Sequence, residues 1–194
     1  LLNIAHGELI MIGAYTTYWL FVLFGISPFY SMFIVLFLNA AIGIFICKFL
    51  FLSIIKKTKS AEAIESNSLL VFFGLSIIFS NTASLLWTAD IRGYSYMNQV
   101  FTIAGVPLMH NRLLALVVSL LVCAACIYMI RRTMLGKAIR ALIQEREAAQ
   151  LVGIPSSRIY YVSFAVAFAL AGLAGVLLSM FYELTPFMGM PYTI

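Results

Sequence analysis

The chain has 194 residues, of which 63% are apolar and 10% charged, and its mean hydropathy is +1.05. Soluble domains are nearer half apolar and a quarter charged, so a chain of one domain's length and this composition does not fit a water-soluble fold. The net charge of +5 does not indicate a nucleic-acid partner, because the basic residues are not interleaved with aromatic residues on a polar domain.

Five apolar stretches are long enough, or nearly long enough, to cross a bilayer as helices. A hydrocarbon core of about 30 Å requires roughly 20 helical residues, and the stretches are continuously apolar rather than alternating like barrel strands. We expect an all-α integral membrane protein with transmembrane helices at 9–26, 29–55, 69–87, 113–130 and 159–182. With no initiator Met and no signal peptide before the first span, residues 1–194 are expected to be part of a longer transmembrane domain.

Polar residues precede the first of these spans, namely Asn3, His6, Gly7 and Glu8. Polar groups at membrane depth tend to line a path or cavity, and broken helices there present free backbone groups to a substrate. The four residues are therefore candidates for a translocation path. Alternatively, His6 and Glu8 lie at the cytoplasmic interface, where simple alternation of the spans places them.

No catalytic or metal-binding motif accompanies these residues. A membrane enzyme could use His6 and Glu8 as an acid–base pair, but the sequence offers no third polar partner and no nucleophile motif. Cys47, Cys123 and Cys126 lie in apolar spans, and the C-x-x-C spacing of the last two lacks a second ligand pair. We therefore expect no catalytic residue, no cofactor, no metal and no disulfide.

The basic residues predict the orientation, because Lys and Arg are retained on the cytoplasmic side. If residues 131–158 lie inside, the loop at 49–67 is also inside, whereas the turn at 25–28 and the loop at 88–112 are outside. Ten basic residues then lie inside, and only Arg92 and Arg112 lie outside. The outer loop is either a structured connection at the interface, which could contain a short hairpin, or a docking surface for an outside partner.

The last span carries small residues at four-residue spacing, Ala167, Ala171 and Gly175. Because no hydrophobic force joins helices in lipid, close backbone approach at such residues holds them together. We expect a tight helix–helix contact on this face, either within one subunit or at a dimer seam.

The polar segment at 131–158 predicts a short amphipathic helix along the inner surface. Its apolar residues Leu135, Ala138, Ile139 and Leu142 share one helical face, and Gly153 suits the left-handed end of a helix. On this basis alone the segment could be a linker helix bound to lipid headgroups.

Three separated motifs in this chain resemble one family of transport proteins. Glu147-Ala148-Ala149 with Gly153 matches the EAA---G signature of ABC importer permeases. This signature, together with the run at 135–141 before it, the motif at 3–15 and the segment at 186–189, resembles the permeases for branched-chain amino acids and their amide and urea relatives.

This resemblance implies a permease subunit of an ATP-driven importer in the bacterial or archaeal cytoplasmic (inner) membrane. The expected partners are a second permease subunit, two cytoplasmic ATP-binding subunits, an extracytoplasmic solute-binding protein and membrane lipid. Residues 131–158 would form the coupling loop, with Arg146, Glu147, Ala148, Ala149 and Gly153 against the ATPase. The chain itself has no G-x-x-x-x-G-K-[ST] loop, so ATP hydrolysis is expected in the partners.

An ion-coupled carrier that needs no ATPase is the alternative to this interpretation. Such a carrier requires carboxylates inside its spans, and the second to fifth predicted spans have none at their centres. The sequence does not identify the solute, because an amino acid and urea need different recognition groups that no motif here specifies.

Overall fold

The computed structural model describes residues 5–58, 60–103 and 106–192. Asn3, a candidate path residue, lies outside them. The chain divides into two compact units, one formed by residues 1–95 and 164–194 and the other by residues 96–163, and each unit is described by itself.

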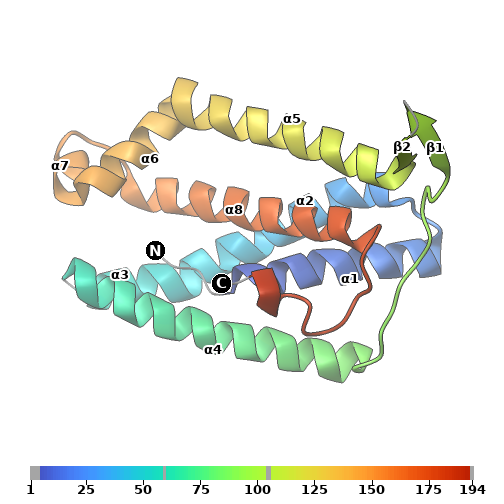
Figure 1. Ribbon diagram of the computed structural model, residues 1–194. Coiled ribbons are helices and arrows are strands. Elements are labelled where there is room, and N and C mark those ends of the chain that lie inside the picture. The colour runs from blue at the N-terminus through green and yellow to red at the C-terminus, as the bar shows by residue number, and fades with distance from the viewer. Residues whose placement is uncertain (1–4, 59, 104–105, 193–194) are drawn as a thin grey trace. The chain divides into compact units, whose positions relative to one another are not determined.

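Within the described residues, five helices are long and apolar enough to cross a membrane. They are α1 (His6–Phe24), α2 (Pro28–Ile46), α4 (Ala61–Trp87), α5 (His110–Arg132) and α8 (Ser156–Ser179). A wide π-helical turn, η1 (Cys47–Phe51), and α3 (Leu52–Lys57) continue α2, so that apolar helix spans Pro28–Lys57. The chain is therefore an all-α multi-pass membrane protein, as predicted (Figure 1).

The helix ends differ from the predicted spans wherever polar residues extend a helix beyond its apolar core. The connection expected at 49–67 is shorter in the structure, because η1 and α3 occupy its first part and α4 begins at Ala61. Charged side chains such as Lys and Glu are good helix formers, so α3 and α4 continue past the apolar stretches. The side-chain oxygen of Ser60 accepts a hydrogen bond from the Ala63 N–H at 3.2 Å and starts α4.

In the first unit, helices approach one another through small residues. A Cβ placed on Gly175 would collide with the Ile10 carbonyl of α1, and one on Gly172 would collide with the Asn39 side chain of α2. Ala171 is buried in an apolar cluster with Leu9 and Ile10. The expected close contact of this helix therefore exists within the chain, where α8 lies beside α1 and α2 (Figure 1).

Ala167 is the exception on this face, because it is exposed. The four-residue spacing from Ala167 to Gly175 is correct for one side of a helix, but α1 covers only the later part of it. Gly172, one residue after Ala171, takes part instead, because α2 approaches α8 at that point.

The second unit contains a hairpin and the polar segment. Strands β1 (Val100–Ile103) and β2 (Val106–Met109) pair antiparallel in the outer loop, and α5 follows directly. The polar segment folds as two helices, α6 (Met134–Gln144) and α7 (Arg146–Leu151), separated at Glu145, whose backbone is extended. The prediction of one amphipathic helix is thus incomplete.

The close contact between Gly175 and α1 predicts that a larger side chain at position 175 destabilises the protein. We expect Gly175→Leu to lower the unfolding free energy of the purified protein by about 2 kcal/mol or more, because the side chain must displace the backbone of α1. Thermal unfolding in detergent measures the effect. Gly74→Leu in α4 is the matched control, since a Cβ added to Gly74 meets nothing within 4 Å. An unchanged melting temperature for Gly175→Leu would contradict the contact.

Candidate functional sites at the start of α1 and in α7

Glu8 is buried in the first turn of α1, with 1% of its surface exposed. Its Oε1 accepts a hydrogen bond from Ser76 Oγ of α4 at 3.0 Å. Its Oε2 is buried and has no hydrogen-bond partner among the described residues. Burying a carboxyl oxygen without a partner is costly, so this position is a candidate contact for a polar solute.

The contact with Ser76 places Glu8 along α4. Ser76 lies fifteen residues after Ala61 and eleven before Trp87 in α4, which places it roughly 22 Å and 16 Å from the two ends of that helix. Glu8 therefore lies beside the middle part of α4, a helix that is long and apolar enough to cross a membrane. The location of His6 and Glu8 at the cytoplasmic interface stays a prediction, as does their place in a translocation path.

The other predicted path residues are close to Glu8 along the chain. Gly7 is buried and His6 is partly buried. Gly189, which follows α8, packs so closely against Gly7 that a Cβ on it would contact the Gly7 carbonyl. The segment after α8 therefore turns back along α1, and its 3-10 turn η2 (Met190–Tyr192) also contacts that helix (Figure 1).

Two polar residues of this region were not among the predicted site residues. One is Ser76, and the other is Asn39, a fully buried residue of α2. Asn39 Nδ2 donates to the Val35 carbonyl at 3.1 Å, while its Oδ1 is buried without a partner among the described residues. An asparagine within an otherwise apolar span is the sequence signal that could have identified it.

In the second unit, the EAA motif lies on α7. Ala149 is buried in a cluster with Leu142 of α6 and Ile159 of α8, so this alanine holds α7 in place. Glu147 and Ala148 are exposed, and Arg146 is partly exposed. The motif thus has one side packed against its own unit and one side free.

The end of α7 presents apolar side chains beside the motif. Leu151 is 88% exposed and Val152 is 78% exposed. Gly153 then ends the segment with a φ of +84°, the left-handed conformation predicted for it. Exposed apolar residues next to a charged motif are typical of a surface that another protein covers.

Comparison with known proteins identifies one family. The family model described as branched-chain amino acid transport system / permease component matches residues 1–194. The high-affinity branched-chain amino acid transport permease protein BraD of Pseudomonas aeruginosa is 28% identical, over 94% of this chain and 62% of its own length. A probable permease of the same transport class, LivH of Methanocaldococcus jannaschii, is 26% identical, over 96% and 59%.

The LivH permease of Escherichia coli K12 is 25% identical, over 97% of this chain and 64% of its own length. The chain thus spans less than two thirds of the relatives that it matches. No solved structure matches it significantly. The match over its whole length shows that this chain belongs to the branched-chain amino acid transport permease family.

Proposed function

We propose that the chain is a transmembrane permease subunit of an ATP-driven importer in the cytoplasmic membrane. It would form part of the path for branched-chain amino acids or related small amides or urea. Its partners would be a second permease subunit, two cytoplasmic ATP-binding subunits and an extracytoplasmic binding protein. The observation that carries the proposal is the half-packed EAA motif: Ala149 anchors α7, while Glu147 and Ala148 remain exposed.

In this mechanism, α7 receives the movement of the ATP-binding subunits. Glu147 and Arg146 would make polar contacts with them, and the small Ala148 would permit close approach. Gly153 ends α7 with a backbone conformation that residues with a Cβ rarely adopt, so the direction of the following chain is fixed. Because Ala149 packs with Ile159, displacement of α7 would also displace the start of α8.

The path itself would pass the start of α1. Polar groups buried among membrane-spanning helices are expensive and are usually functional, and Glu8 and Asn39 each keep a buried oxygen without a partner among the described residues. A solute with N–H groups, which amino acids, amides and urea all have, could donate hydrogen bonds to such oxygens. This supports a path role for His6, Gly7 and Glu8, with Asn3 preceding them in the chain.

Charge reversal at Glu147 tests the coupling role. In the complete importer reconstituted in proteoliposomes, we expect Glu147→Arg to reduce ATP-driven leucine uptake and solute-stimulated ATP hydrolysis by about tenfold, because like charges oppose docking. Glu65→Arg is the control, because it makes the same charge change at an exposed glutamate of α4. Unchanged uptake and hydrolysis in Glu147→Arg would refute the coupling role.

Removal of the Glu8 charge tests the path role. Glu8→Gln keeps the side-chain size and an oxygen that can accept from Ser76, so we expect a folded complex. Uptake of labelled leucine should fall about tenfold, as expected for loss of a hydrogen bond to a charged group. Glu65→Gln serves as the matched control on the surface, and normal uptake by Glu8→Gln would exclude Glu8 from the path.

A further inference from the structure

A groove lined only by apolar side chains runs between α2 and α4 in the first unit. Its volume is about 410 Å³. The lining residues include Leu38, Ile42, Phe45 and Leu50 of α2 and η1, together with Leu75 and Phe79 of α4. With no polar side chain in its lining, the groove suits a hydrocarbon ligand and gives a polar solute no hydrogen bond.

The floor of the groove is fixed and its side is open. Ile42, Leu75 and Phe79 pack against the buried cluster that contains Ile46 and Phe72, so the floor belongs to the core of this unit. Phe45 on the rim is 59% exposed. Because α2 and α4 are both long and apolar enough to cross a membrane, an open apolar side between them is accessible from the acyl chains of the bilayer.

The length of the groove matches one leaflet. On α2 and η1 it extends from Leu38 to Leu50, which corresponds to roughly 18 Å along a helix. Half of a typical hydrocarbon core is about 15 Å. The groove therefore suits a single acyl chain that lies along α2.

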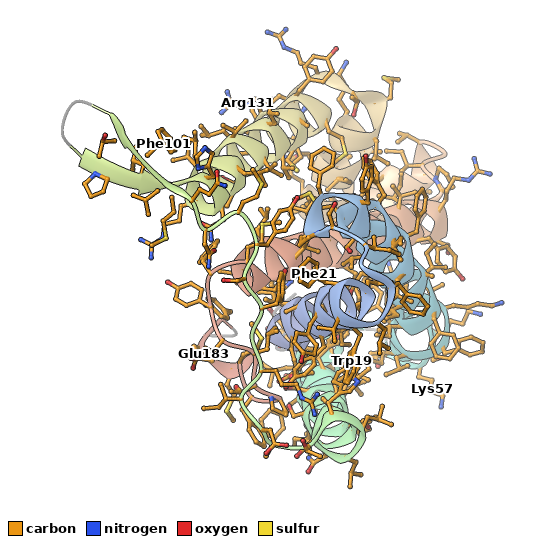
Figure 2. The ribbon with its side chains drawn as sticks, turned by 90° about the vertical axis from the view of Figure 1, so that its right-hand side faces the viewer. Trp19, Phe21, Lys57, Phe101, Arg131 and Glu183 are labelled. Atoms are coloured by element: carbon orange, nitrogen blue, oxygen red, sulfur yellow. The ribbon has the colours of Figure 1, made fainter. Side chains whose placement is uncertain are left out.

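A lysine ammonium group lies at one end of this groove. Lys48 Nζ is 5.4 Å from the ring centre of Phe49, and the Phe49 ring packs on that of Phe45 at 4.5 Å. Since Phe45 lines the groove, only these two rings separate the ammonium group from it. Lys56 and Lys57 follow in the last turn of α3, and Figure 2 shows Lys57 at the edge of the helices.

The charge of Lys48 is available to a ligand. Its side chain is exposed, and no carboxylate among the described residues pairs with it. The acidic residues that begin α4, Glu62 and Glu65, precede Leu75 by at least ten residues, or roughly 15 Å of helix. They therefore lie well away from the α4 wall of the groove.

The position of Lys48 along the helix also suits a lipid headgroup. Lys48 follows Pro28, the first residue of α2, by about 20 residues, which corresponds to roughly 30 Å, the thickness of a hydrocarbon core. A helix that enters the bilayer at Pro28 thus brings Lys48 to the headgroups of the other leaflet. Lys48 also belongs to the π-helical turn η1, and such turns are frequent at functional sites.

We propose that the groove between α2 and α4 binds an anionic phospholipid. One acyl chain lies along the groove, and the phosphate lies against Lys48, with Lys56 and Lys57 adding positive charge nearby. The distribution of basic residues assigns this end of α2 to the cytoplasmic side, where basic pockets between membrane-spanning helices bind anionic headgroups. The inference does not depend on which solute the protein transports.

Photo-crosslinking of the full-length protein with its associated subunits tests the site. The probes are phosphatidylglycerol and phosphatidylcholine with identical acyl chains that carry a photoreactive diazirine, and mass spectrometry maps the labelled residues. We expect phosphatidylglycerol to label Leu38, Phe45 and Phe79 at a several-fold lower concentration than phosphatidylcholine, because only the former has a net negative charge for Lys48 to meet.

Variants of Lys48 test the headgroup contact. Lys48→Gln should weaken labelling of the groove by phosphatidylglycerol about fivefold, the effect of one lysine at an anionic surface, and leave phosphatidylcholine unchanged. Lys48→Arg keeps the charge and should label like the wild type. Arg112→Gln is the control, because it removes a positive charge at another exposed residue and should change neither lipid.

A variant of the groove tests the acyl-chain contact. Ala41 lines the groove and is exposed, so Ala41→Phe fills the groove without adding volume to the core. We expect it to abolish labelling of Leu38 and Phe79 by both lipids, with an unchanged melting temperature.

Three results would each overturn the proposal. They are equal labelling by the two lipids in the wild type, labelling of Lys48→Gln by phosphatidylglycerol within twofold of the wild type, and no labelling of the groove at all. The last result would mean that protein covers the groove. ATP-driven uptake by the same preparation tests the proposed function separately, so the lipid site can fail while the permease function stands.

Discussion

The contact on which the first unit depends is the backbone approach of α8 to α1 at Gly175. Lipid provides no hydrophobic force between helices, so dispersion at close range must hold them. Gly175 lets the Ile10 backbone approach, and Gly172 does the same for Gly13. This contact fixes the position of α1 against α8. The position of Glu8 against Ser76 and that of Tyr15 against Trp87 both follow from it.

Much of this fold could be predicted from hydropathy, because a continuous apolar run in lipid has to be helical to satisfy its backbone. The left-handed end at Gly153 was likewise predictable from local chemistry. The contact between Glu8 and Ser76 was not, because the two residues are far apart in sequence and no local pattern links them.

Other differences also come from tertiary contacts. The exposure of Ala167 depends on how far α1 extends along α8, which no periodicity reveals. The return of the segment after α8 to Gly7 requires the close fit of Gly189. A single glycine in the sequence does not indicate which residue will pack against it. Single polar residues in apolar runs, such as Asn39 and Ser76, were the strongest signals left unused.

The continuity of α8 has a mechanical consequence. This helix starts in the unit that contains the EAA motif, where Ile159 packs with Ala149, and it ends in the unit where Gly175 meets α1. A single α-helix resists stretching and sharp bending, so it behaves as a rod over its 24 residues. If α7 receives movement from a partner subunit, as we propose, α8 would carry that movement along the chain from the EAA motif to Gly172 and Gly175.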